Sequence, residues 1–216
     1  MAYNGQAEQD KFVLNVLKNK RNGFFVEIGS NHPVNISNSF LLESQYGWRG
    51  IMVEYDSSFL PLYEQHRPNS IHVINDATKI DYLDLFTKHN LPSNIDYLQI
   101  DLEASNMSTI NTLIKLDKEV LDIYKFSVVT FEHDIYSDSD KSKTREASRD
   151  IFLKRGYKLV FPDIHNTLPK YVYEDWYVHP DLVDMNYIDT LIQKNVSNYE
   201  PNTITGKSIG WDKIMY

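Results

Sequence analysis

The stretch GFFVEIGSN, residues 23–31, decides the fold, because it joins a short apolar run to a glycine turn. The run Phe24–Ile28 has the length and composition of a strand that is buried on both faces. It follows Ala7–Lys20, whose apolar residues recur at helical spacing, and Gly23 stands at the end of that segment. The stretch therefore predicts a helix that leads into a buried strand, followed by a sharp turn at Gly29.

The same alternation continues along the chain. Further strands are expected at Ile51–Glu54, His72–Asn75, Tyr97–Ile100, Val128–Phe131, Tyr157–Phe161 and Tyr171–Val178. Helices are expected at Ser37–Tyr46, Phe59–His66, Tyr82–Lys88, Thr109–Leu116, Thr144–Arg155 and Asp181–Lys194. Alternating strands and helices predict an α/β fold with a mostly parallel, twisted sheet and helices on both faces. Such sheets bind ligands outside the carboxyl ends of their strands.

The composition is that of a globular domain. Of 216 residues, 42% are hydrophobic and 24% are charged, and no linker or repeat divides them, so we expect one domain, residues 1–216. The first residues lack the order of a signal peptide, and no stretch approaches the roughly 18 apolar residues of a membrane helix. We expect an intracellular, cytoplasmic protein without a membrane span.

Charge and cysteine content exclude several classes of function. The 22 basic residues against 30 acidic ones give a net charge of −8, which disfavours nucleic acid as a partner. The absence of cysteine excludes disulfides, thiolate zinc sites and thiol nucleophiles. Any metal would be bound by oxygen and imidazole ligands.

Polar residues after the first three strands suit a nucleoside ligand. The single Gly29 lets a cofactor approach the backbone, but a dinucleotide fold would have three glycines here. Glu54 ends the second strand and can accept both hydroxyls of a ribose, although an ordinary surface carboxylate is the alternative. Asp76 and Ala77 follow the third strand, where they could contact an adenine or begin a helix.

Two acidic clusters follow the fourth and fifth strands. Asp101-Leu102-Glu103 and Glu132-His133-Asp134 would face one crevice of a parallel sheet. Gathered carboxylates with an imidazole are ligands suited to magnesium or manganese. The alternative is that Glu132 and His133 only hydrogen-bond to neighbouring loops.

Several of these segments together resemble the FkbM-like family of class I S-adenosylmethionine-dependent methyltransferases. The similar segments, spread over most of the chain, are GFFVEIGSNHPVNISNSFLLE (residues 23–43), YGWRGIMVEYD (46–56), IDYLQIDLEAS (95–105), TFEHD (130–134) and YEDWYVHP (173–180). The chain departs from the family pattern at Ser30–Pro33, and at Gln99, Ala104 and Asn106. The resemblance implies a Rossmann-like class I methyltransferase fold whose last strand runs antiparallel.

The resemblance also implies roles for individual residues. The methionine end of the cofactor would be held by Glu27, Gly29, Ser30, Asn31 and Ser37, with Asn38 as a further contact, the ribose by Glu54, and the adenine by Asp76 and Ala77. A divalent metal, Mg²⁺ or Mn²⁺, would be bound by Asp101, Glu132 and His133. Asp101, Glu103 and His133 are the candidate catalytic residues.

By this resemblance the protein would be an O-methyltransferase that modifies a sugar hydroxyl of a glycan. The motif sequences are most similar to those of homologues from large DNA viruses that methylate a terminal deoxyhexose such as rhamnose. A viral origin would place the protein in host cytoplasm. The alternatives are a methyltransferase for a lipid or small-molecule hydroxyl, and a non-catalytic nucleotide-binding module.

Overall fold

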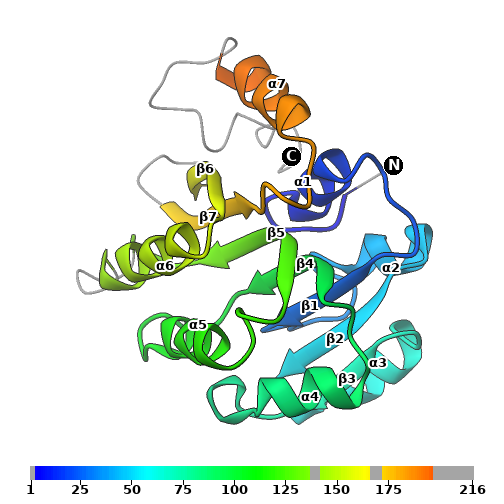
Figure 1. Cartoon of the computed structure of the whole chain (residues 1–216). Helices are drawn as coiled ribbons and strands as arrows, with labels where there is room; N and C mark the ends of the chain where they lie inside the picture. The colour runs from blue at the N-terminus through cyan, green and yellow to red at the C-terminus, as the bar shows by residue number, and fades with distance from the viewer. Residues whose placement is uncertain (1–2, 137–141, 166–171, 197–216) are drawn as a thin grey trace.

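Seven strands form one sheet in the order β3-β2-β1-β4-β5-β7-β6 in the computed structural model, which describes residues 3–136, 142–165 and 172–196 (Figure 1). The strands are β1 Phe24–Ile28, β2 Arg49–Glu54, β3 Ile71–Ile74, β4 Asn94–Ile100, β5 Lys125–Glu132, β6 Lys158–His165 and β7 Val172–Val178. Strands β1 to β5 are parallel, while β7 runs antiparallel to both β5 and β6. The predicted mostly parallel sheet with a reversed last strand is confirmed.

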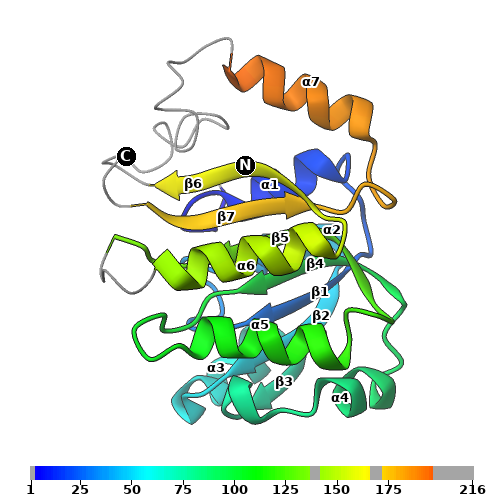
Figure 2. The ribbon, with the colours of Figure 1, turned by 60° about the vertical axis from the view of Figure 1, so that its left-hand side comes forward.

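Helices cover both faces of the sheet, as predicted (Figures 1 and 2). The α-helices are α1 Gln9–Val16, α2 Phe40–Tyr46, α3 Leu60–His66, α4 Tyr82–Lys88, α5 Ser108–Glu119, α6 Ser142–Lys154 and α7 Met185–Val196, with short 3₁₀ turns η1 Ser57–Phe59 and η2 Ala77–Lys79. One apolar core lies between the sheet and α4, α5 and α6. A second core lies on the opposite face, against α1, α2, α3 and α7. We call these the α5 face and the α1 face.

The first two helices are much shorter than their sequence patterns predict. The pattern over Ala7–Lys20 yields only α1, because Lys18 and Asn19 adopt left-handed φ values of 51° and 56° that no helix continues. The pattern from Ser37 yields a helix only from Phe40, whose N–H donates to the Ser37 hydroxyl. Residues 37–39, which precede α2, belong instead to the loop between β1 and α2. None of the helices within the described ranges is long and apolar enough to cross a membrane.

Candidate active site

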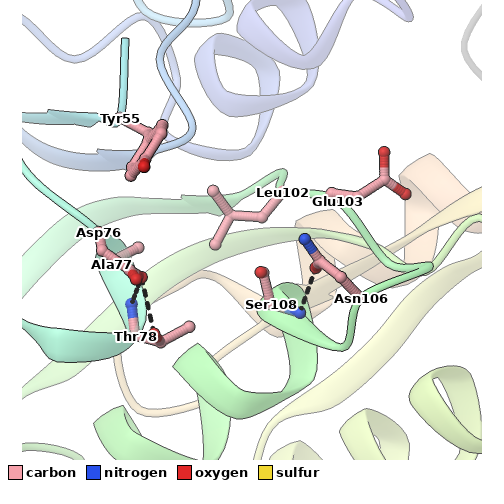
Figure 3. Close-up of a pocket in the computed structure, with 8 residues that line it drawn as sticks. All are labelled: Tyr55, Asp76, Ala77, Thr78, Leu102, Glu103, Asn106 and Ser108. Atoms are coloured by element: carbon pink, nitrogen blue, oxygen red, sulfur yellow. Dashed lines mark hydrogen bonds between the residues drawn. The ribbon is translucent and has the colours of Figure 1, made fainter. Parts of the chain in front are cut away.

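Two cavities lie side by side at the carboxyl ends of β1 to β4. The larger, of ≈ 470 Å³, is lined by Tyr55, Asp76, Ala77, Thr78, Leu102, Glu103, Asn106 and Ser108 (Figure 3). The smaller, of ≈ 230 Å³, is lined by Gln6, Glu27, Gly29, Ser30, Asn31, His32, Asn35, Ile36, Ser37, Asn38, Gln99 and Asp101. All five residues predicted for the methionine end line the smaller cavity, and both predicted adenine contacts line the larger one.

Gly29 joins the loop after β1 to the end of β4. Its φ is +86°, and a Cβ atom added there would lie 1.7 Å from the backbone oxygen of Asp101. Any other residue would therefore clash with main chain that cannot rotate away. The absence of a side chain lets the two strand ends approach and form one wall of the smaller cavity.

The smaller cavity is rich in hydrogen-bond acceptors that lack donors. Three buried oxygens on its lining residues, Glu27 Oε1, Asn38 Oδ1 and Gln99 Oε1, have no hydrogen-bond partner among the described residues. Buried polar atoms are normally paired, so three unpaired acceptors on residues that line one cavity are compatible with a ligand that donates hydrogen bonds there. An ammonium group, with three N–H donors and a positive charge, has that chemistry.

Glu27 is the charged member of this set. Burial raises its pKa to about 7, and Arg67, whose Nη1 lies 4.0 Å from Glu27 Oε2, opposes the rise. The hydroxyl of Ser39 donates to the same oxygen over 2.8 Å. The buried Arg67 is held chiefly by Glu43 at 2.8 Å, so it compensates Glu27 only in part. A cation in the smaller cavity would favour the ionised form of Glu27.

The larger cavity has apolar walls and a polar edge. The Leu102 side chain points into the space between Tyr55, Ala77 and Ser108 (Figure 3). Asp76 accepts hydrogen bonds from the Thr78 amide and hydroxyl, so it begins the turn η2 and also lines the cavity. The structure thus confirms that Asp76 begins a helical turn, while contact with an adenine stays a prediction. A flat, apolar space with carboxylates at its rim suits an aromatic base that carries an amino group.

Glu54 connects the two cavities without appearing in the lining of either. Its carboxylate accepts hydrogen bonds from the backbone N–H groups of Asn31, Tyr55 and Asp56, at 2.8, 2.8 and 2.9 Å. It therefore ties the loop after β1 to the loop after β2. Contact with a ribose stays a prediction for this residue.

Asp101 and Glu132 lie beside one another on the α1 face. The register of β4 and β5 pairs Ile100 with Phe131, which places the next residue of each strand side by side. Burial is the largest cause that raises the pKa of both carboxyl groups, and the charge of Asp101 raises that of Glu132 further. A hydrogen bond from Glu132 opposes the rise at Asp101. The pKa of Glu132 is thus raised more strongly than that of Asp101, so Glu132 holds a proton more readily than Asp101 does.

His133 does not join this pair. Successive residues of a strand point to opposite faces, so His133 turns to the α5 face and is fully buried there. Its Nε2 lies 3.6 Å from Asp175 Oδ1 and 3.9 Å from Asp163 Oδ1. The structure thus separates the predicted set of metal ligands, Asp101, Glu132 and His133. It also places the imidazole on the face away from both cavities, where it is not positioned to act as a catalytic residue.

His133, Asp163 and Asp175 are the sole group of three potential metal ligands that the described ranges contain. Arg149 donates to Asp175 Oδ1 and Oδ2 at 2.8 and 2.7 Å and to Asp163 at 2.9 Å. Arg145 donates to Asp163 at 2.9 Å. Two guanidinium groups already neutralise these carboxylates, so the group fits an ion-pair network and does not fit a divalent metal.

Glu103, the remaining predicted catalytic residue, lines the larger cavity. Its Oε1 accepts hydrogen bonds from the Ser105 amide and hydroxyl, which fixes the side chain in the loop after β4. The structure thus places it with the predicted adenine contacts.

Sequence patterns missed several residues around the cavities. Tyr55 directly follows Glu54 and Leu102 directly follows Asp101, so a prediction extended by one position along each loop would include both. Asn106 and Gln99 had been noted only as departures from a family pattern. Arg67 carries no local signal, because its partners Glu27, Ser39 and Glu43 are distant in the sequence.

Comparisons with known proteins support the fold. No protein-family model matches the chain, and no curated protein sequence matches it. A putative rRNA-methylase from Clostridium thermocellum superposes with a TM-score of 0.53 at 8% identity, covering 82% of this chain and 98% of that one. A TehB-like SAM-dependent methyltransferase from Corynebacterium glutamicum gives a TM-score of 0.47 at 10% identity, covering 79% and 87%. Together with the strand order, the first likeness assigns the chain to the Rossmann-like class I methyltransferase fold.

Proposed function

We propose that the protein is an S-adenosylmethionine-dependent O-methyltransferase that acts on a sugar hydroxyl of a glycan. The observation that carries the proposal is the set of three unpaired acceptor oxygens around the smaller cavity, next to a larger cavity with apolar walls. S-adenosylmethionine has an ammonium group at one end and an adenine at the other, with a ribose between them. Each end matches the chemistry of one cavity.

The cofactor would lie across the carboxyl ends of β1 to β4. Glu27, Asn38 and Gln99 would accept hydrogen bonds from the ammonium group, and Gly29 would leave room for the methionine chain. The adenine would lie between Tyr55 and Leu102, beside Asp76 and Ala77. Glu54, which joins the two loops, would accept the ribose hydroxyls. The carboxyl groups around the smaller cavity also favour the positive sulfonium.

Methyl transfer needs alignment and removal of one proton. The acceptor oxygen forms a bond to the methyl carbon while the carbon–sulfur bond breaks, and the neutral thioether of S-adenosylhomocysteine leaves. Holding donor and acceptor in line can lower the barrier by about 7 to 11 kcal/mol in favourable cases. Asp101, the member of the carboxyl pair whose pKa is raised less, would take the hydroxyl proton. Glu132 would hold the Asp101 carboxylate in place. His133, the third residue predicted to bind a metal, lies on the opposite face from Asp101 and Glu132.

The charges near the acceptor side favour a neutral substrate. Asp101, Glu132 and Asp134 gather at the ends of β4 and β5, and the chain carries a net charge of −8. Phosphate-rich acceptors such as nucleic acids would be repelled from this position. A sugar hydroxyl, for example on a terminal deoxyhexose such as rhamnose, brings no charge and donates hydrogen bonds to carboxylates.

Calorimetric titration with S-adenosylhomocysteine tests the cofactor assignment. The wild-type protein should bind it, and Glu27→Gln should weaken binding roughly 10-fold or more, because a hydrogen bond to a charged group is lost. Glu174→Gln is the matched control, since Glu174 is a buried carboxyl on the same face that lines neither cavity. Absence of binding, or equal loss in both variants, would refute the assignment.

A further inference from the structure

Arg67, which directly follows α3, is a fully buried cation that contacts the loop between β1 and α2. Its Nη1 donates to the Pro33 carbonyl and to the Ser37 hydroxyl, both over 3.2 Å, and its Nη2 donates to the Ser39 hydroxyl over 2.7 Å. Its Nε donates to Glu43 on α2 over 2.8 Å. A buried guanidinium is stable only when its donors are satisfied, so these contacts fix the loop, which supplies most of the lining of the smaller cavity.

Ser39 connects Arg67 to Glu27. Its hydroxyl accepts a hydrogen bond from Arg67 and donates one to Glu27 Oε2 over 2.8 Å, which a hydroxyl can do at the same time. Arg67 Nη1 also lies 4.0 Å from Glu27 Oε2. Both contacts engage Oε2, whereas Oε1 has no hydrogen-bond partner among the described residues. The carboxylate is therefore anchored at one oxygen, and the other is left for a ligand in the smaller cavity.

The charges of this buried cluster do not balance. When both carboxyl groups are ionised, Glu27 and Glu43 bring two negative charges against the single positive charge of Arg67. Glu43 lies closer to the guanidinium and also accepts hydrogen bonds from the Asn69 amide and the Ser70 hydroxyl, at 3.0 and 2.6 Å. The unmatched negative charge therefore belongs to Glu27, beside the cavity, where a cationic ligand would compensate it.

We propose that Arg67 is a positioning residue for the cofactor: acting through Ser39, it fixes the Glu27 carboxylate so that Oε1 accepts a hydrogen bond from the ammonium group of S-adenosylmethionine. This inference rests on the proposed function. Arg67 lines neither cavity, so it acts on the ligand only through its partners. None of those partners lines the larger cavity, so the effect is confined to the amino-acid end of the cofactor.

Calorimetry with two ligands tests this role. S-adenosylhomocysteine carries the ammonium group, whereas 5′-methylthioadenosine has the same adenine, ribose and sulfur but no amino acid. Ser39→Ala keeps the ion pair between Arg67 and Glu43 and removes the link to Glu27. It should weaken S-adenosylhomocysteine binding roughly 5- to 10-fold and leave 5′-methylthioadenosine binding within about twofold. Equal weakening of both ligands, or unchanged affinity for S-adenosylhomocysteine, would overturn the proposal.

Arg67→Lys keeps the positive charge beside Glu43 but loses the planar fork of donors, so it should cause the same ligand-selective loss. Arg149→Lys, in the network on the α5 face, is the matched control and should bind both ligands as the wild type does.

A double-mutant cycle tests whether the effect passes through Glu27. In a Glu27→Gln background, Ser39→Ala should weaken S-adenosylhomocysteine binding by less than about twofold more, because the group it acts on has been changed. A full further loss would contradict the proposal. If the wild-type protein does not bind S-adenosylhomocysteine, the proposed function fails. If it binds and the loss in Ser39→Ala is not selective between the two ligands, only the positioning role fails.

Discussion

The two faces of the sheet near β5 and β7 both carry buried and half-buried carboxyl groups, but the charge of these groups is compensated on one face only. On the α5 face, Asp163 and Asp175 are bound by Arg145 and Arg149. On the α1 face, none of Asp101, Glu132 and Glu174 forms an ion pair with lysine or arginine within the described part of the chain. Neighbouring cations and hydrogen-bond donors hold the pKa of Asp175 well below its ordinary value despite burial, whereas burial raises that of Glu174 to about 8.

The difference separates a structural cluster from a candidate reactive one. A compensated network holds elements together, here α6 against β6 and β7, and has no unmet charge to offer a ligand. Carboxyl groups left without cations cost stability, and such sites are where pKa values become suited to proton transfer. Each of the following predictions tests this contrast.

The largest expected effect is on methyl transfer. Glu132→Gln keeps the shape of the protonated carboxyl but cannot share a proton with Asp101, so turnover of labelled S-adenosylmethionine with a rhamnoside should fall by about 10² to 10⁴. The variant should lose little stability, since the amide replaces a buried carboxyl whose pKa is raised by burial and by the charge of Asp101. Glu64→Gln, exposed on α3, is the control and should be fully active. Full activity of Glu132→Gln would remove the carboxyl pair from the mechanism.

The α5 face should instead respond in stability. Arg149→Met leaves the buried Asp175 and its neighbour Asp163 without their main partner, and should lower the free energy of unfolding in urea by about 3 kcal/mol. Arg155→Met removes more exposed pairs with Asp117 and Asp122 and should cost less than about 1 kcal/mol. S-adenosylhomocysteine binding by folded Arg149→Met should match wild type. Similar costs for the two arginines would contradict the contrast.

The two faces should also respond to pH in opposite directions. The folded pKa of Glu174 lies above its ordinary value of 4.5, so its contribution to stability is present below pH 4.5 and is lost as pH rises to about 8. The folded pKa of Asp175 lies below its ordinary value of 3.8, so its contribution is present above that pH and is lost in acid. Urea unfolding between pH 5 and 8 should show stability falling with pH, and Glu174→Gln should flatten that fall by up to roughly 1 kcal/mol per pH unit. An unchanged slope would mean that Glu174 is not the group responsible.

The smallest expected effect is that of a chelator. Of the residues predicted to bind a metal, Asp101 and Glu132 lie on the α1 face and His133 on the α5 face. Turnover in EDTA should therefore stay within about twofold of turnover without it, because the carboxyl pair is assigned to proton removal. Added Mg²⁺ or Mn²⁺ should not raise it. Loss of activity in EDTA that either ion restores would contradict this prediction, and would show that the acidic groups of the α1 face bind a metal ion.

The sequence was sufficient for the fold because short apolar runs and helical stripes are local signals. It also located half of the residues that line the two cavities, since the carboxyl ends of parallel strands converge. It did not separate Glu132 from His133, because strand alternation puts adjacent residues on opposite faces only as far as the strand extends, and the sequence does not show where β5 ends. The unpaired oxygens of Asn38 and Gln99 were equally out of reach. Whether a buried acceptor has a donor depends on every neighbour in space, and no pattern records that.

The link between Gln9 and Glu174 has a consequence for the order of assembly. Gln9 Nε2 donates to Glu174 Oε2 across 165 residues of sequence, and Phe12 stacks on Trp176 with ring centroids 4.5 Å apart. Both contacts join the first helix to the seventh strand, while Gln6, just before that helix, lines the smaller cavity. On the ribosome the first helix therefore emerges long before β7, and these two contacts cannot form until β7 has been synthesised. The segment that carries Gln6 into the wall of the smaller cavity is therefore anchored to β7 only at that late stage.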